Sequence, residues 1–244
     1  MLPALRDAWA TVVPDMKDRH GPLPPLMLVL TVVTGLVDAF SYLLLGHVFV
    51  ANMTGNVVFL GFATAGAAGF SLAASLVALA AFTGGALLGG RIVRCGHAHR
   101  GRMVYLTLLL ETALVAAAYG VTLVAGVPYG HDARYALIAL LALGMGAQNA
   151  GARALAVPDL TTTVLTLTIT GTAADSRLAG GTDSRIGRRA LSALSMFLGA
   201  LIGALAVLHG QPALPLLVAA LLLASGSAAA FRLSRSQGTW TDPL

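Results

Sequence analysis

Two groups of polar residues interrupt strongly apolar sequence, one in each half of the chain. The first comprises residues 35–39 (Gly-Leu-Val-Asp-Ala) and 52–56 (Asn-Met-Thr-Gly-Asn); the second comprises 146–150 (Gly-Ala-Gln-Asn-Ala) and 158–163 (Pro-Asp-Leu-Thr-Thr-Thr). Polar and ionisable side chains are costly in hydrocarbon, so where they occur they commonly line a cavity, a proton relay or a solute path. Two such groups at matching positions predict two halves of one site near the membrane midplane.

Asp38 is the best single candidate for chemistry. It belongs to a set of polar residues that recur at spacings of three and four and therefore share one helix face: Thr31, Thr34, Asp38 and either Ser41 or Tyr42. A buried carboxylate without a cation partner can take up and release a proton, so Asp38 could couple transport to protons. The alternative is a structural hydrogen bond, for instance to Asn52 or to the amides beside it, and the two interpretations carry equal weight.

Asn52 and Asp159 each precede a run that resembles a helix. The simplest interpretation is a helix N-cap, in which the side chain accepts hydrogen bonds from the first free amides. A helix N-terminus at membrane depth also attracts anions and polar groups, so this interpretation is compatible with substrate binding. Thr54, Gly55 and Asn56 would then form the first turns of the helix after Asn52.

The second polar group contains Gln148 and Asn149, and Asn149 shares a helix face with Arg153 four residues later. Thr162 begins a series of threonines at every fourth residue, which could line a hydroxyl-rich path or bond back to their own helix. Arg153 could pair with an acidic residue, although extension of its guanidinium to the membrane interface is favoured. The predicted substrate-binding residues are Asp38, Tyr42, Asn52, Thr54, Gly55, Asn56, Gln148, Asn149, Asp159, Thr162 and Thr163.

Glu111 lies near the middle of another apolar stretch, one helical turn after Thr107. A glutamate inside a membrane is a functional hypothesis by default, and Glu111 is therefore the second predicted proton-coupling residue. It ranks below Asp38 because the other half of the chain has no counterpart.

Composition places these residues in a membrane. The chain is 57% hydrophobic and only 10% charged, with a mean hydropathy of +0.82, whereas soluble domains carry about 25% charged residues. The basic residues lie at the ends of apolar stretches rather than in a patch interleaved with aromatic residues, so no nucleic-acid partner is expected despite a pI near 10.0. The single cysteine, Cys95, excludes an internal disulfide framework.

The apolar sequence divides into eight stretches, two of which are doubtful as spans because a spanning helix needs about 20 apolar residues. These two, 48–68 and 159–174, carry the second part of each polar group. If both are broken or re-entrant, all the basic clusters lie on one side with the N-terminal tail, as the positive-inside rule expects. The eight stretches are 26–45, 48–68, 71–92, 103–126, 134–153, 159–174, 189–209 and 213–233.

The predicted fold is therefore an all-α integral membrane protein with six transmembrane helices and two broken or re-entrant segments, eight spans being the alternative. Both termini are expected in the cytoplasm. Residues 26–126 and 134–233 would form two inverted repeats between an N-terminal tail (1–25) and a C-terminal tail (234–244). Gly85-Ala-Leu-Leu-Gly89 matches Gly199-Ala-Leu-Ile-Gly203, and both motifs let helices approach closely, within the monomer or in a homo-oligomer.

Several enzyme chemistries lack their usual motifs. The sequence has no Gly-rich phosphate loop ending in Gly-Lys, no His-Glu-x-x-His, no paired-cysteine motif and no Gly-x-Ser-x-Gly. We therefore expect a protein that is not an enzyme and that uses no metal or other cofactor.

The polar motifs and their surroundings resemble the YoaK family of bacterial inner-membrane proteins, a family of unknown function. The resemblance covers residues 25 to 233 approximately and implies a multi-pass protein of the bacterial inner membrane, but it implies no activity. In the second motif Gly171 is placed late, which leaves the break in that helix undefined. The matching residues are 35–39, Ser41, Tyr42, Gly46, Phe49, Val50, 52–56, Gly61, Gly144, Met145, 148–150, Arg153, Pro158, Asp159, Thr162 and Thr163.

The sequence predicts a membrane transporter of a small polar or anionic solute, with membrane lipid and the solute as its partners. A channel-type pore is the nearest alternative, and it would tolerate neutralisation of Asp38 whereas a proton-coupled carrier would not. A non-transporting scaffold or sensor is a third possibility from another functional class. A scaffold would hold its polar residues in closed hydrogen-bonded pairs without a water-accessible cavity.

Overall fold

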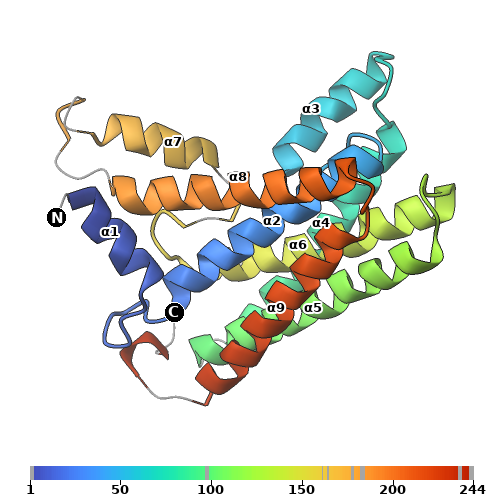
Figure 1. Ribbon diagram of the computed structural model, residues 1–244. Helices are drawn as coiled ribbons and strands as arrows, with labels where there is room; N and C mark the ends of the chain where they lie inside the picture. Colours follow the sequence, from blue (N-terminus) through green and yellow to red (C-terminus); the bar gives the residue numbers. More distant parts are fainter. Residues whose placement is uncertain are drawn as a thin grey trace.

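A computed structural model describes residues 3–96, 99–160, 162–163, 165–176, 179–181, 185–235 and 238–241. Throughout this part of the chain the regular structure is helical, which confirms the predicted all-α membrane protein (Figure 1). Thr161 and Arg177 lie outside the described residues. The helices are α1 (Pro3–Val12), α2 (Leu23–Leu44), α3 (Met53–Thr64), α4 (Leu72–Gly96), α5 (Arg100–Val124), α6 (His131–Leu155), α7 (Leu165–Ala174), α8 (Ile186–Leu208) and α9 (Leu214–Leu233), with a 3-10 turn, η2 (Thr239–Thr241).

Six of these helices, α2, α4, α5, α6, α8 and α9, are long and apolar enough to cross a membrane. The other two apolar helices have only 12 residues in α3 and 10 in α7. A helix rises about 1.5 Å per residue, so α3 covers about 18 Å, well short of the hydrocarbon thickness of about 30 Å. The structure therefore agrees with six spans and two short segments rather than with eight spans.

The short helices follow breaks in the backbone that the local sequence explains. After α2, Gly46 and His47 both have positive φ, of 86° and 54°, and the chain runs irregularly to Asn52 before α3 begins. After α6, Ala156 has a φ of 48° and Pro158 follows, and a proline cannot continue a helix because it lacks an amide hydrogen. We call residues 45–52 the first joint and residues 156–160 with 162–163 the second joint.

The closest helix packing joins the two halves of the chain. α2 packs along α8, α4 along α6, and α5 along α9. The glycine motifs allow this approach, since Gly85 of α4 faces the backbone of Leu143 and Gly199 of α8 faces the backbone of Val32. Both motifs therefore pack within the monomer.

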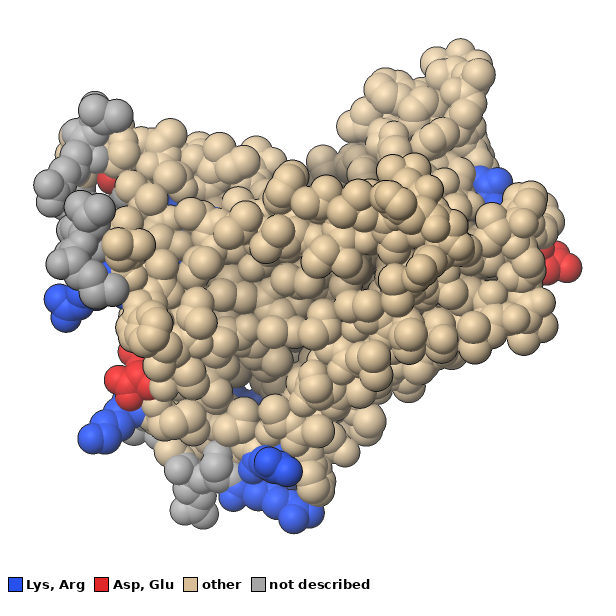
Figure 2. Space-filling view, in the orientation of Figure 1, with Lys and Arg blue, Asp and Glu red and all other residues tan. Residues whose placement is uncertain are grey.

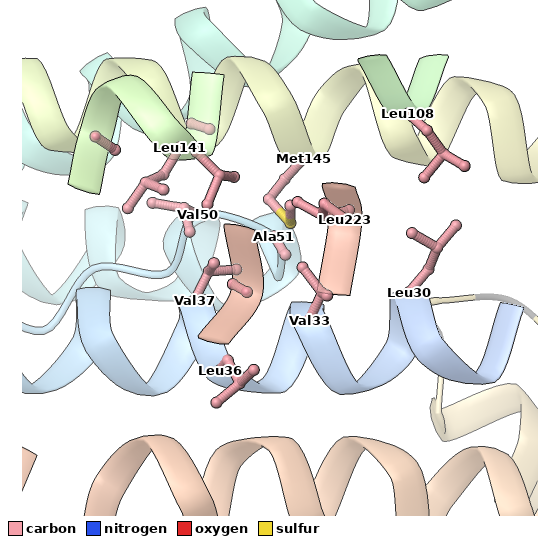
Figure 3. Close-up of a cluster of buried hydrophobic side chains, with 14 of the residues drawn as sticks. Leu30, Val33, Leu36, Val37, Val50, Ala51, Leu108, Leu141, Met145 and Leu223 are labelled. Carbon is pink, nitrogen blue, oxygen red and sulfur yellow. The ribbon is translucent and has the colours of Figure 1, made fainter. Parts of the chain in front are cut away.

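From Val48 to Ala51 the first joint runs through the interior, whereas His47 before it is exposed. Val50 is fully buried and Ala51 is 2% exposed. Figure 3 shows both residues between Val33 and Val37 of α2 and Met145 of α6. An irregular backbone at this depth requires internal hydrogen-bond partners, because neither lipid nor a packed apolar core can supply them.

The two ends of the bundle differ in charge. Both termini lie at the end where α2 begins, and Figure 2 shows Lys and Arg concentrated toward that end. Arg134, at the start of α6, is the exception among the described Lys and Arg residues, and its Nε donates to the carbonyl of Leu45 at 2.7 Å.

His20 lies at the basic end, in the segment between α1 and α2, and its Nδ1 is buried without a hydrogen-bond partner among the described residues. Burial and the nearby positive charge of Arg100 lower the pKa of His20 from its ordinary value of 6.5. In the unfolded chain this histidine takes up its proton at a higher pH than in the native protein. Its contribution to stability is therefore fully present above about pH 6.5 and is lost as the pH falls through the lower native pKa.

We accordingly expect the melting temperature of the detergent-solubilised protein to decrease on acidification below pH 6.5 and His20→Gln to reduce that decrease. His209→Gln, at an exposed histidine beyond α8, is the matched control and should retain it. Equal pH profiles for the wild type and the His20→Gln variant would contradict the assignment.

Candidate functional site

Asp38 holds the first joint in place. This residue of α2 is 4% exposed, and its Oδ1 accepts hydrogen bonds from the amides of Val50 at 3.0 Å and Ala51 at 2.9 Å. Its Oδ2 accepts a further bond from the side-chain amide of Asn52. These contacts are the structural hydrogen bonds that the sequence left as an alternative, and they satisfy donors at a depth where water is scarce.

Asn56 closes the same joint from the first turn of α3. Its Oδ1 accepts from the amide of Phe49 at 2.9 Å, and its Nδ2 donates to the carbonyl of Phe49 at 2.6 Å. Asn52 occupies the N-cap position of α3, but its side chain makes no cap bond and donates to Asp38 instead. The prediction that Asn52 caps the helix was therefore wrong, because the carboxylate of a distant residue is its partner.

A cavity of about 310 Å³ opens beside Asp38, and we call it the Asp38 pocket. One wall comes from α2 and the first joint, where Tyr42 stacks on Phe49 with their ring centroids 4.9 Å apart. The opposite wall comes from α8. The lining residues are Gly35, Asp38, Ala39, Tyr42, Leu43, Phe49, Asn52, Met196, Ala200 and Ala204.

Asn149 occupies the corresponding position in the second half. Its Oδ1 accepts a hydrogen bond from the hydroxyl of Thr163 at 2.7 Å, and its Nδ2 donates to the carbonyl of Met145 at 2.9 Å. A cavity of about 760 Å³, the Asn149 pocket, lies between α6, the second joint and α4. Among its lining residues are Asn149, Arg153, Thr162, Thr163, Phe82, Ala86, Gly90 and Val93.

The two pockets are related position by position. Asn149 lies 111 residues after Asp38, and Thr163 lies 111 residues after its partner Asn52. The same offset relates Tyr42 to Arg153 and Leu43 to Ala154, all of which line a pocket. On the other wall, Met196, Ala200 and Ala204 lie 114 residues after Phe82, Ala86 and Gly90.

The structure brings the predicted residues together at two sites and not at one. Among the described residues the two pockets share no lining residue, and α3 makes no contact with α7. Because α2 and α6 run in opposite directions (Figure 1), the pockets lie toward opposite ends of the bundle. The expectation that the two polar groups form one site near the membrane midplane is therefore not fulfilled.

Asp159 differs most from its predicted role. It lies before α7 begins and has a φ of 61°, and among the described residues its carboxylate accepts from arginine side chains and not from an amide of α7. Its carboxylate pairs with Arg189 at 2.8 Å and with Arg185 at 3.2 Å, and Arg189 also pairs with Asp175 at 2.9 Å. Asp159 is therefore part of an ion-pair network that ties the second joint and the end of α7 to α8.

The remaining predicted residues have varied surroundings. Thr54 is exposed on α3, and Gly55 lies against the ring of Phe49, where a side chain would collide. Gln148 donates from Nε2 to the hydroxyl of Thr34 at 3.0 Å and does not line either pocket. Glu111 is fully buried and lines a separate small cavity together with Gln148.

Sequence reasoning missed one wall of each pocket. The α4 and α8 residues there are small or apolar and carry no chemical signal of their own. The detectable signal was the repeat of the Gly85 and Gly199 motifs, which fixes the 114-residue offset. Within the described ranges no group of three or more His, Cys, Asp or Glu residues could hold a metal ion.

Comparison with known proteins gives a family but no activity. A family model described as "Protein of unknown function (DUF1275)" matches residues 26–229. A relative, the UPF0700 transmembrane protein YoaK of Bacillus subtilis (strain 168), is 34% identical over 146 residues. That match covers 59% of this chain and 63% of the relative, so it spans less than two thirds of the relative's length. No solved structure matches the chain.

Proposed function

The chain belongs to the DUF1275 family of membrane proteins, and from that premise we propose that it is a carrier for a small polar or anionic solute. The observation that carries the proposal is the pair of pockets at opposite ends of the bundle. Each pocket reaches a polar residue on the first long helix of its half, Asp38 on α2 and Asn149 on α6. A carrier needs one access route from each side of the membrane.

An inverted repeat underlies this proposal. α2 of the first half packs on α8 of the second, and α6 of the second half packs on α4 of the first. The contacts match under the 114-residue and 111-residue offsets given above, because Gly85 faces Leu143 as Gly199 faces Val32. If the α2–α8 contact and the α4–α6 contact exchanged their packing geometries, one pocket would open while the other closed. Other transporters with inverted repeats achieve alternating access in this way.

The separation of the pockets favours a carrier over a channel. A channel needs a continuous path, whereas these two pockets share no lining residue in the described part of the chain. α2 and α8 pack tightly beside the Asp38 pocket, because a side chain at Gly35 would collide with the backbone of Met196. Solute would therefore cross by a change of helix packing.

The polar groups of the pockets suit a small solute with an acidic group. The Asn149 pocket offers the guanidinium of Arg153 and the buried hydroxyl of Thr162. The Asp38 pocket offers a carboxylate, which would repel an anion unless a proton neutralised it. An anion could bind near Arg153 in one pocket and could also pass Asp38 in the other if a proton neutralised that carboxylate. We propose proton coupling for this reason.

The distribution of charge supports an orientation with both termini in the cytoplasm of the bacterial inner membrane. The described Lys and Arg residues other than Arg134 belong to segments at the end where the termini lie. Cytoplasmic loops carry an excess of Lys and Arg. In this orientation the Asp38 pocket faces outward and the Asn149 pocket faces the cytoplasm.

Two equivalent positions test this arrangement. In a Cys95→Ser background, we expect Leu43→Cys to react with an impermeant thiol reagent applied from outside and Ala154→Cys to react only from the cytoplasmic side. The accessible sides follow from the opposite ends at which the pockets lie. The measurement is labelling of intact cells and of inverted membrane vesicles.

Leu87→Cys is the control, because Leu87 of α4 is 59% exposed in the structure but lines neither pocket and should face lipid. The labelled variants are then reconstituted in liposomes and tested for counterflow of small carboxylates and phosphate. A carrier exchanges solute and is blocked by the label at either position. Labelling of both positions from one side, or solute flux without counterflow, would reject the proposal.

A further inference from the structure

A small cavity lies among α2, α5 and α6; it shares Ala152 with the Asn149 pocket and no lining residue with the Asp38 pocket. Its volume is about 20 Å³, and a cavity needs about 10–15 Å³ by this measure to hold one water molecule. The polar side chains in its wall are Thr107 and Glu111 of α5 and Gln148 of α6. Nearly all of the other lining residues are buried and apolar. The volume of the cavity therefore allows one particle of the size of a water molecule, and its polar contacts come from these three side chains.

Three oxygen atoms in this wall lack partners. Oε1 and Oε2 of Glu111 and Oε1 of Gln148 are buried and form no hydrogen bond with any described residue. Glu111 is fully buried and Gln148 is 1% exposed. Buried polar groups without partners are rare in native proteins, and each one indicates an additional bound species or a functional role.

The orientation of the Gln148 amide is fixed by its other contact. Thr34 donates its hydroxyl proton to the carbonyl of Leu30 at 2.9 Å, so its oxygen can only accept a hydrogen bond from Gln148. The donor must be Nε2 of Gln148, which leaves Oε1 as the free atom. Thr107 likewise donates to the carbonyl of Met103 at 2.9 Å and keeps its lone pairs free.

We propose that this cavity binds one small monovalent cation between Glu111 and Gln148, either a proton taken up by the Glu111 carboxylate, with a water molecule in the cavity, or a sodium ion. The available atoms are the carboxylate, the amide oxygen and the hydroxyl oxygen of Thr107, all of which accept and none of which donates toward the cavity. An isolated ionised carboxylate is very costly to bury, so a positive partner stabilises it. One carboxylate balances one positive charge, whereas divalent calcium sites recruit several oxygen ligands and usually more carboxylates.

No other charge competes for Glu111. The remaining residues that line the cavity do not titrate. Among the described residues, none of the other charged side chains on α2, α4, α5, α6 and α9 lines the cavity, although Arg100 donates to the carbonyl of Leu155 in its wall at 2.8 Å. These charged residues are Asp38 on α2, Arg91 and Arg94 on α4, Arg100 and Arg102 on α5, Asp132, Arg134 and Arg153 on α6, and Arg232 on α9. The cation site stands without the transport proposal, since binding can occur whether or not solute moves. In the carrier proposed above, the cation at Glu111 would be coupled in addition to the proton at Asp38.

The test is the melting temperature of the purified full-length protein in detergent. Sodium chloride is titrated at constant chloride against N-methylglucamine, a cation too large for the cavity. A second series lowers the pH without sodium but stays above pH 6.5, where the contribution of His20 to stability is fully present. A ligand that binds only the native state raises the melting temperature with its concentration. A rise with sodium identifies a sodium site, and a rise only with acidification identifies a proton site.

Glu111→Gln, which removes the charge and keeps the shape, should abolish the response in either series. Gln148→Met, which removes the amide oxygen at similar volume, should raise the half-effective cation concentration by roughly tenfold. Asp132→Asn, the same type of change at an exposed residue of α6, should leave the response intact. A wild type that responds to neither cation, or a Glu111→Gln variant that responds like the wild type, would overturn the proposal.

Discussion

Replacement of Asp38 by alanine should disrupt the first joint and lower the free energy of unfolding by about 4 kcal/mol. The change removes the acceptor of three hydrogen bonds, from the amides of Val50 and Ala51 and from the side chain of Asn52. Both backbone amides are buried between α2 and α6, where a donor without a partner costs about 1–3 kcal/mol. Thermal or denaturant unfolding in detergent measures the loss.

Two further variants separate the contacts. Asp38→Asn keeps one oxygen that can accept from the amides of Val50 and Ala51, but its side-chain NH2 group would face the NH2 group of Asn52. We therefore expect about half of the alanine effect on the free energy of unfolding, roughly 2 kcal/mol. Exchange of the two residues, Asp38→Asn with Asn52→Asp, places a carboxylate opposite an amide again and should recover most of that loss. Recovery in the double variant would identify the pair itself as the cause.

Asn149→Ala is the matched control in the other half. Asn149 accepts one bond from Thr163 and donates one to Met145, so its removal should cost only about 1 kcal/mol. If Asp38→Ala proves no more costly than Asn149→Ala, Asp38 does not hold the joint.

The second large effect concerns two adjacent glycines of α4. Gly85→Ala should lower the free energy of unfolding by about 2–3 kcal/mol, because the new methyl group would collide with the carbonyl oxygen of Leu143 on α6. Backbone atoms cannot move aside as a flexible side chain can, so the two helices must separate. Thermal unfolding in detergent measures this effect as well.

Gly84→Ala is the control, one residue away in the same helix. Its methyl group would lie 3.6 Å from Cδ1 of Leu143, an ordinary van der Waals distance. Alanine is favoured over glycine in a helix interior by up to about 1 kcal/mol, so this variant should be as stable as the wild type or more stable. Equal losses in the two variants would show that helix contact is not the cause.

The helices of this protein could be predicted closely from local sequence. Apolar stretches at 26–45 and 213–233 became α2 (Leu23–Leu44) and α9 (Leu214–Leu233), because a membrane helix satisfies its backbone internally and its length reflects the bilayer. The stretches at 48–68 and 159–174 were also identified as broken or re-entrant, because only that assignment places all the basic clusters on one side of the membrane.

The candidate site was harder to predict because its contacts are distant in sequence. Asp159 after Pro158 has the local pattern of an N-cap, but Arg185 and Arg189, more than twenty residues later, bind its carboxylate. Asp38 and Asn149 were identified from their polarity, whereas the wall that completes each pocket is contributed by a helix of the opposite half. Spacing along the chain does not reveal that each long helix packs against a helix of the opposite half.

The packing of each half against the other also affects how the protein assembles during synthesis. During synthesis α2 enters the membrane long before its partner α8 leaves the ribosome, and α4 likewise precedes α6. Until then Thr34 lacks its hydrogen bond from Gln148, and the first half cannot complete its own packing. Assembly is therefore expected to be post-insertional and cooperative: the helices enter in order, the two halves interlock only when the last pair arrives, and a nascent chain that stalls midway exposes polar residues that mark it for degradation.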